Sequence, residues 1–132
     1  MKILFVFDIL YMVRIFKNRW FTRFADKESI TDNELREMVN LLEAGQTGAN
    51  LGGGVYKVRL ARPSEGKSGG YRVILFFRNE DKTFFHYAYP KARRDNINEK
   101  ELRLFKKMAK RYLAIGDSDL AEAVKVRKFV EI

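Results

Sequence analysis

The feature that most restricts the fold is a run of three strand-like segments in the middle of the chain, at residues 55–61, 71–77 and 83–89. In the first segment apolar side chains alternate with Lys57 and Arg59, which is the period of a strand with two different faces. The second and third segments are apolar and are joined through the polar segment Asn79-Glu80-Asp81-Lys82, which predicts a β-hairpin. The centre of the molecule is therefore expected to be an antiparallel sheet.

Helical patterns precede these strands. Residues 17–27 carry aromatic side chains at helical spacing. Thr31 and Glu34 form a capping box, in which Thr31 accepts a hydrogen bond from a first-turn amide and Glu34 reaches back. The helix that begins there is predicted to end at Gly45. Two short helices are thus expected before the sheet, and residues 13–16 are predicted to open a strand ahead of them.

A second cap follows the strands, at Asn98 and Glu101, and predicts a helix with one apolar face and one lysine-rich face. Residues 117–124 are predicted to form a short helix and residues 126–132 a closing strand. This order predicts an α+β fold, with helices before and after an antiparallel sheet. No linker composition interrupts the chain, so residues 1–132 are expected to form a single domain.

The chain has no cysteine and a single histidine, His86. Disulfides, thiol catalysis and cysteine-bound zinc are therefore excluded, and a histidine-based metal site or catalytic triad would depend on that residue alone. No cofactor is expected. His86 lies in an aromatic strand, so we interpret it as a packed residue, with a general base as the alternative. Among the aromatic residues of that strand, Tyr89 is the one most suited to stack on a base, with core packing as its alternative.

The first residues, MKILFVFDILYMV, are apolar, but Asp8 interrupts the run and Arg14 with Lys17 follow it. A secretory signal needs about 7–15 uninterrupted apolar residues before a cleavage site, and a transmembrane helix needs about 20. Neither pattern fits, so we expect a cytoplasmic protein with no membrane partner. Residues 1–11 are predicted to be an edge strand, or an extension upstream of an alternative start at Met12.

Positive charge is concentrated in the strand region. Between Leu51 and Arg94 there are ten Lys and Arg residues against three acidic residues, which accounts for +7 of the net charge of +9. Charge concentrated in this way is typical of a surface that binds a polyanion, and nucleic acid is the first candidate.

Three of these cations are candidates for a phosphate site. Lys57 and Arg59 lie on one strand face, because alternate residues point the same way. Arg72, near the start of the next strand, joins them if the two strands pair. Such a cluster would bind a phosphate and stabilise the charge that develops on it during transfer. The alternative is a solvated polar face with no catalytic role.

Further cations flank this set. Lys91, Arg93 and Arg94 follow the third strand, where they either close the phosphate site from its other side or form a charged turn. The glycine-rich loop between the first two strands contains Arg62 and Lys67. We predict that this loop is a flexible, basic flap beside the polyanion.

The chain resembles the RelE/ParE superfamily of type II toxins, specifically its RelE/HigB-like branch. The segments that carry the resemblance are RIFKNRWFTRFA, LGGGVYKVRLARPSEGKSGGYRVI, YPKARRDNI and the helix leading to Leu113. The combination of LGGG, a K-x-R strand, GKSGGYR and a K-x-x-R-D-N-I tail is specific. The resemblance runs from about Val13 to the C-terminus, so residues 1–11 lie outside it.

The resemblance implies a compact protein with N-terminal helices packed on a twisted antiparallel sheet. It implies a ribosome-dependent endoribonuclease that cuts mRNA when a ribose 2′-hydroxyl attacks the adjacent phosphate, leaving a 2′,3′-cyclic phosphate and a 5′-hydroxyl without a metal. It also implies a cognate acidic antitoxin that covers the basic surface. The toxin alone is expected to be a monomer.

By position, the resemblance assigns Arg72 to the scissile phosphate. It assigns Lys57 to proton abstraction, provided that its surroundings favour the neutral amine. Arg59 is too weak a base for that role and is expected to stabilise charge. Lys91 or Arg94 would protonate the leaving oxygen or orient the substrate. Other RNA contacts are predicted at Arg62, Lys67, Tyr89 and Arg93.

Two other functions remain open from the sequence. A toxin on the same scaffold could inhibit DNA gyrase by binding, with no chemistry of its own, although ParE-like relatives generally lack the basic set found here. A non-catalytic member could bind RNA or a regulatory partner, and that binding would depend strongly on salt.

Overall fold

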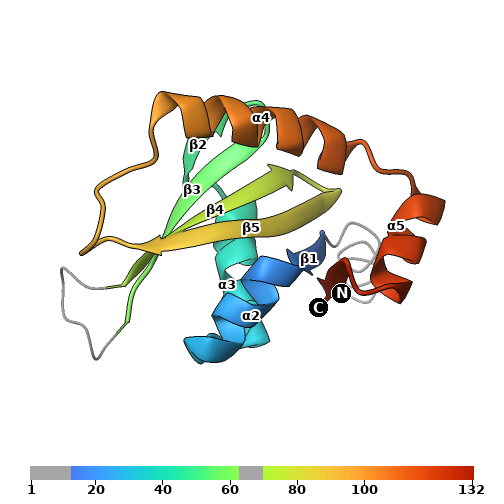
Figure 1. The fold of residues 1–132 in the computed structure, drawn as a ribbon, viewed down its shortest axis with the longest axis horizontal. Coiled ribbons are helices and arrows are strands. Elements are labelled where there is room, and N and C mark those ends of the chain that lie inside the picture. The colour runs from blue at the N-terminus through green and yellow to red at the C-terminus, as the bar shows by residue number, and fades with distance from the viewer. Residues whose placement is uncertain (1–12, 63–69) are drawn as a thin grey trace, which may run out of the picture.

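The computed structural model describes residues 13–62 and 70–132 of the chain. A six-stranded sheet in the order β2-β3-β4-β5-β1-β6 carries helices on both of its faces (Figure 1). Its strands are β1 (Arg14–Asn18), β2 (Ala49–Gly52), β3 (Val55–Leu60), β4 (Tyr71–Arg78), β5 (Lys82–Pro90) and β6 (Phe129–Glu131). The helices are α2 (Arg19–Lys27), α3 (Asp32–Glu43), α4 (Glu99–Leu113) and α5 (Asp117–Lys125). The predicted strand or extension at residues 1–11 lies outside the described residues, as does Lys67.

The predicted α+β architecture is confirmed. β3, β4 and β5 form the antiparallel centre of the sheet, with Val58 opposite Val73 and Val73 opposite Ala88. Two features were not predicted. β1 runs parallel to β5, and the short strand β2, which has no apolar alternation, pairs with β3 across an irregular register.

Side-chain caps fix where the helices begin. Thr31 and Glu34 exchange two hydrogen bonds, of 3.1 and 2.9 Å, so the predicted capping box of α3 is confirmed. Asn98 and Glu101 form the same arrangement at the start of α4. The side chain of Asn18 caps α2. None of the described helices has the length and apolar composition that a membrane span requires.

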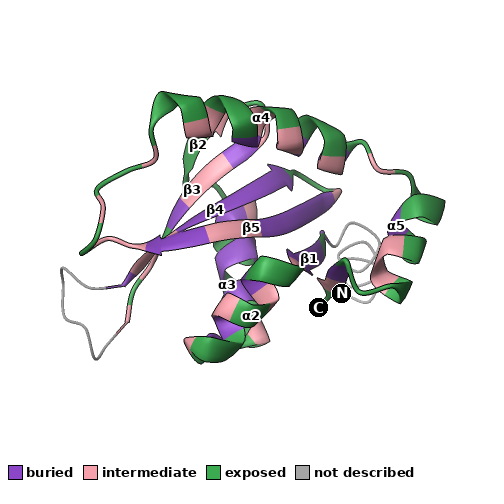
Figure 2. Cartoon of the chain, in the orientation of Figure 1, coloured by how far each residue is buried: buried purple, intermediate pink, exposed green. Residues whose placement is uncertain are grey.

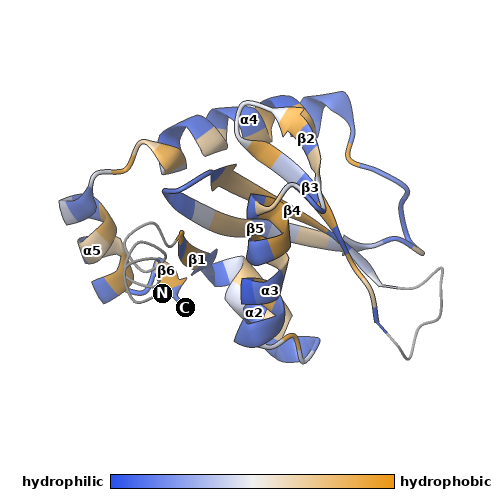
Figure 3. Cartoon of the chain, turned by 180° about the vertical axis from the view of Figure 1, so that it is seen from behind, coloured by the Kyte–Doolittle hydropathy of each residue, from blue (hydrophilic) through white to orange (hydrophobic). Residues whose placement is uncertain are grey.

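Two hydrophobic clusters fill the two sides of the sheet. α2 and α3 cover one side and α4 covers the other (Figure 1). β4 and β5 are buried along most of their length, which explains why apolar and aromatic residues make up most of both strands (Figure 2). Seen from behind, α3 carries hydrophilic and hydrophobic residues together, as a helix with one buried face should (Figure 3). Aromatic rings dominate the α4 side, where the cluster includes Phe16, Phe76, Phe84, Phe105 and Phe129.

A bulge in β5 changes which side chains face α4. Leu75 pairs with Phe85 and Ile74 pairs with Tyr87, which leaves His86 as the extra residue. The His86 ring consequently stacks in the α4-side cluster, whereas Ala88 packs on the α2 and α3 side. Strict alternation would put His86 and Ala88 on one face of the strand, and the bulge between them places them on opposite faces.

The turn between β2 and β3 lies against the C-terminal end of α4. Gly54 there has φ +86°, and a Cβ on it would lie 2.6 Å from Leu113 Cδ1. Only glycine combines this backbone conformation with so close an approach. The glycine run thus allows the turn to pass next to the helix.

Gly54→Ala is expected to lower the free energy of unfolding by about 2–5 kcal/mol. The left-handed backbone costs an L-residue about 1–2 kcal/mol, and the overlap with Leu113 adds about 1–3 kcal/mol. Gly45→Ala is the matched control, since Gly45 has φ +70° and its surroundings leave open space for a Cβ. Urea unfolding of both variants measures the difference. Equal losses would show that the overlap with Leu113 is relieved by repacking and would contradict the prediction.

Candidate functional site

Strand register brings the three candidate phosphate ligands to one face of the sheet. Arg59 pairs directly with Arg72, and Lys57 lies two residues along β3 on the same side. Arg72 in turn pairs with Tyr89 of β5. This is the face that α4 covers, at the end of the sheet where β5 leads into the connection to α4 (Figure 1). The condition set from the sequence, that Arg72 joins Lys57 and Arg59 if the strands pair, is met.

Two polar atoms at this place are buried without a hydrogen-bond partner among the described residues. They are Nη1 of Arg72 and the hydroxyl oxygen of Tyr89. Buried donors that lack a partner cost free energy, so natural proteins keep them rarely and usually for a reason. A guanidinium group and a phenol on neighbouring strands are suited to donate hydrogen bonds to one anion.

The segment after β5 closes over this cluster. Lys57 Nζ donates to Asn96 Oδ1 at 3.2 Å. The Arg94 guanidinium lies 4.9 Å from the centre of the Tyr89 ring, and it also donates to the Asn96 carbonyl oxygen and to both carboxylate oxygens of Glu101. Hydrogen bonding to Arg94 holds the pKa of Glu101 below its usual value. Asn96 and Glu101 therefore hold the side chains of Lys57 and Arg94 in place at the candidate site.

Sequence reasoning assigned no site role to these two residues. Glu101 was recognised only as part of a helix cap, and Asn96 only as a letter of the tail motif. The hydrogen bond from Lys57 to Asn96 joins residues 39 positions apart. A contact between residues so distant in sequence cannot be predicted from a local pattern. The motif K-x-x-R-D-N-I was nevertheless a usable signal, since Arg94 and Asn96 are both in it.

Tyr89 differs most from its predicted role. Its side chain is in the core on the α4 side, with 2% of the residue exposed, and Arg94 covers one face of its ring. The ring is therefore not offered to a base in this arrangement. The hydroxyl group, and not the ring face, is the part of Tyr89 that lacks a partner among the described residues.

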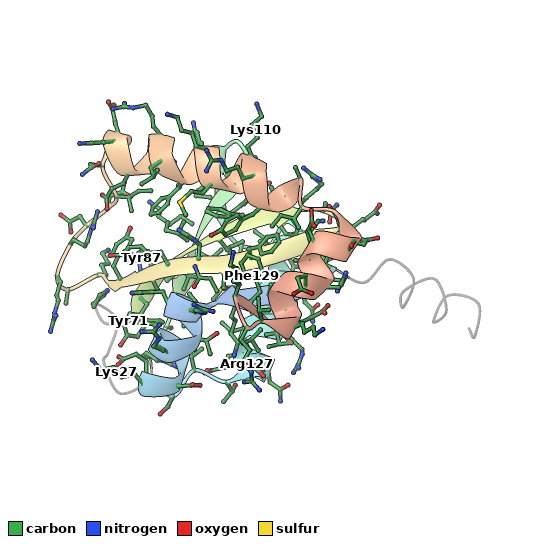
Figure 4. All side chains as sticks on the ribbon, turned by 45° about the vertical axis from the view of Figure 1, so that its right-hand side comes forward. Lys27, Tyr71, Tyr87, Lys110, Arg127 and Phe129 are labelled. Atoms are coloured by element: carbon green, nitrogen blue, oxygen red, sulfur yellow. The ribbon has the colours of Figure 1, made fainter. Side chains whose placement is uncertain are left out.

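Two further predicted contacts, Lys91 and Arg93, follow the end of β5. Lys91 is half-buried, and its backbone N–H donates to the Gly70 carbonyl oxygen. Arg93 is exposed and lines a cavity of about 390 Å³ between α2 and the ends of β4 and β5. Tyr71 and Lys27, which line the same cavity, are labelled in Figure 4.

Arg62 is not brought to the phosphate cluster. Its guanidinium group forms an ion pair of 2.9 Å with Glu34 and donates to the Glu28 carbonyl oxygen, on the side of the sheet that α2 and α3 cover. Lys67, the other cation predicted in this loop to contact RNA, lies outside the described residues.

His86 is a packed residue, as predicted. Its ring stacks on Phe76 with a centroid distance of 4.7 Å, and its Nδ1 accepts a hydrogen bond of 3.0 Å from the Asn18 side-chain amide. Burial lowers the pKa of His86 to about 4, so the ring is neutral at physiological pH. Phe105 and Tyr112 pack edge-on against it.

Stability is expected to fall as the pH is lowered from 6.5 towards 4. The unfolded chain takes up a proton on His86 near its usual pKa of 6.5, whereas the folded protein does so only near 4. The unfolded state therefore binds more protons in this window, which costs about 2–3 kcal/mol by pH 4. His86→Phe should flatten this part of the profile in thermal unfolding measured against pH. An unchanged slope in the variant would assign the effect to other groups.

Within residues 13–62 and 70–132, no group of three or more His, Asp and Glu side chains is arranged to hold a metal ion. The candidate site is instead built from guanidinium, ammonium, phenol and amide groups. Such groups, presented together from one face of a sheet, are suited to bind a polyanion.

Comparison with known protein families gives one match that covers most of the chain. Residues 13–132 match the family described as the RelE toxin of the RelE/RelB toxin-antitoxin system, and the chain belongs to that family. It is therefore a toxin of a toxin–antitoxin system, with a cognate antitoxin as its partner. No curated protein matches the chain significantly.

Proposed function

We propose that this toxin is an endoribonuclease that cuts mRNA on translating ribosomes in the cytoplasm. The observation that carries the proposal is the buried Nη1 of Arg72, which has no hydrogen-bond partner among the described residues and lies on the same face as Lys57 and Arg59. A cation held in this way is suited to bind a phosphate that becomes more negative in the transition state.

The reaction is a transfer of the phosphoryl group within the RNA strand. The ribose 2′-oxygen forms a bond to the adjacent phosphorus as its proton passes to a base. The bond from phosphorus to the 5′-oxygen of the next nucleotide breaks, and that oxygen takes up a proton. The products are a 2′,3′-cyclic phosphate and a 5′-hydroxyl, so no water is consumed and no oxidation occurs.

Each candidate side chain has a role in this reaction. Arg72 holds the scissile phosphate, and Arg59 stabilises its developing charge. Lys57, fixed by Asn96, is the candidate base for the 2′-hydroxyl proton. Lys91 is the candidate donor for the leaving 5′-oxygen. Arg94 is already bound to Glu101 and Asn96, so it shapes the site and adds positive charge.

Tyr89 adds a hydrogen-bond donor beside Arg72. Burial raises the pKa of the Tyr89 hydroxyl above its usual value, which keeps the group protonated at neutral pH. A protonated phenol can donate to a phosphate oxygen. This use of Tyr89 explains why its buried hydroxyl lacks a partner among the described residues.

Tyr89→Phe is expected to reduce the cleavage rate at saturating substrate by about 10–100-fold, because it removes one donor aimed at the reacting phosphate. KM should change little, since the ring and its contact with Arg94 remain. Tyr87→Phe is the matched control, from the same strand, and should retain nearly full activity. Cleavage by Tyr89→Phe at the wild-type rate would show that the Tyr89 hydroxyl takes no part in the reaction.

The proposed function is tested by primer extension across an mRNA after brief induction of the toxin in cells. New 5′ ends within translated frames, absent from uninduced cells, are the expected result. Growth arrest with DNA gyrase damage and no new ends would overturn the proposal in favour of gyrase inhibition. Soluble toxin with neither arrest nor new ends would favour a non-catalytic binding protein.

A further inference from the structure

A second cationic surface lies on the far side of α4 from the sheet. The helix buries one side, through Phe105, Ala109 and Leu113, against the hydrophobic cluster of that face. Its outer side is exposed along its length (Figure 2). That side carries the α4 cation row, five exposed residues: Lys100, Arg103, Lys107, Lys110 and Arg111. Figure 4 shows Lys110 projecting from the helix away from the sheet.

The positive charge of the α4 cation row is not neutralised within the described part of the chain. None of its five members forms a salt bridge or a side-chain hydrogen bond with another described residue. The helix has two acidic residues, Glu99 and Glu101, both in its first turn. Glu101 is already bound by Arg94. The row from Lys100 to Arg111 is about 16 Å long at 1.5 Å per residue.

We infer that the α4 cation row binds the sugar–phosphate backbone of double-helical RNA. Cations that share one helix face and form no ion pair among the described residues are suited to release the counterions of a nucleic-acid backbone on contact and to bind it with little dependence on sequence. Double-helical RNA is recognised mainly in this way, through its shape and its phosphates.

The composition of this surface favours a duplex over the other polyanions and over a protein. Single strands are held by exposed aromatic rings, and the row contains none. Protein interfaces have an apolar centre, whereas Leu104, 55% exposed, is the sole large hydrophobic residue exposed among the described residues of α4. The apolar side of α4 packs against the sheet. The helix therefore has no exposed apolar face that could bind a membrane surface.

The inference rests on the proposed function in one respect: a nuclease that acts on ribosomes meets double-helical RNA around the message. The row and the cleavage site are separate surfaces. Arg72, Lys57 and Tyr89 face the sheet side of α4, and the row faces outward. A duplex on the outer side would therefore anchor the toxin while the sheet side holds the single strand to be cut.

The test is binding of the full-length toxin to a fluorescent RNA duplex of about 16 base pairs, a length that a compact RNA-binding domain covers. Anisotropy is measured at several salt concentrations. One variant replaces four cations of the row: Lys100→Gln, Arg103→Gln, Lys107→Gln and Lys110→Gln. The control variant makes the same change in net charge at four exposed cations elsewhere: Arg23→Gln, Lys27→Gln, Lys125→Gln and Lys128→Gln.

The row variant is expected to lose at least about tenfold in duplex affinity at physiological salt, and its salt slope should decrease by about 3, whereas the control keeps the wild-type slope. Equal losses in both variants would overturn the inference, because they would reflect net charge alone. Wild-type affinity of the row variant would also overturn it. Binding of each variant to poly-glutamate is measured in the same way. If the row variant loses binding to poly-glutamate but still binds the duplex, the inference is overturned and the row is assigned to an acidic protein instead.

The two proposals fail in different ways. Duplex binding that depends on the row, without any cleavage of translated mRNA, would refute the proposed function and leave the row as an RNA-binding surface. Wild-type cleavage on ribosomes by the row variant, with unchanged duplex affinity, would refute the inference alone.

Discussion

Arg72→Ala is expected to reduce ribosome-dependent cleavage of mRNA by about 10²–10³-fold. Removing one preorganised donor from a site that stabilises developing negative charge has this size of effect. Arg72 lies between Arg59 and Tyr89 in the register of the sheet, and its Nη1 is buried without a partner among the described residues. The rate is measured on purified ribosome–mRNA complexes with the toxin in excess.

Two further variants make this result interpretable. Arg72→Lys keeps the charge but loses the planar, forked donor set, so intermediate activity is expected. Arg23→Ala removes an exposed arginine of α2 and should cut at the wild-type rate. Thermal unfolding establishes that all three variants are folded. Cleavage by Arg72→Ala at the wild-type rate would show that Arg72 takes no part in the reaction.

Phe84→Ala is expected to lower the free energy of unfolding by about 3–5 kcal/mol, the usual cost of emptying a buried aromatic site. Phe84 is fully buried, and its ring lies 5.1 Å from that of Phe16, 5.4 Å from that of Tyr112 and 5.1 Å from that of Phe129. These rings belong to β1, α4 and β6, so one side chain joins three elements that are distant in sequence. Urea unfolding followed by circular dichroism gives the value.

Leu104→Ala is the control for this stability change. Leu104 is 55% exposed on α4, so its truncation should change the free energy of unfolding by less than about 0.5 kcal/mol. A loss below about 1 kcal/mol for Phe84→Ala would mean that neighbouring rings fill the space, in contradiction to the close-packed cluster described above.

The elements and the faces of this protein could be predicted because they depend on local patterns. The capping boxes at Thr31 and Asn98 are formed by residues three positions apart, so a short sequence pattern is enough to predict them. The shared face of Lys57 and Arg59 follows from the two-residue period of a strand. Arg72 required only that two neighbouring strands pair, which the apolar pattern already favoured.

The rest depends on contacts between residues far apart in sequence. No local sequence pattern predicts that β1 joins the sheet parallel to β5, or that a bulge places His86 and Tyr87 on the same side of the sheet. Arg62 was predicted as an RNA contact from its position in a basic loop. Its ion pair with Glu34, 28 residues away, could not be seen without the fold.

Tyr89 shows how burial changes an interpretation. Its place in a run of aromatic residues next to basic ones suggested stacking on a base. The sheet register buries its ring under Arg94 and leaves its hydroxyl beside Arg72. A contact between Tyr89 and RNA stays a prediction, and the structure changes which part of the residue could make it, from the ring face to the hydroxyl group.

The central claim is that the ribose 2′-hydroxyl attacks the phosphate held by Arg72. The most direct measurement compares cleavage of two ribosome-bound mRNAs, identical except that one carries a 2′-deoxyribose at the nucleotide before the cut. The account predicts cleavage with a 5′-hydroxyl end in the all-ribose message and no cleavage at the deoxy position. Equal cleavage of both messages would show that another nucleophile attacks the phosphate, and would contradict the account.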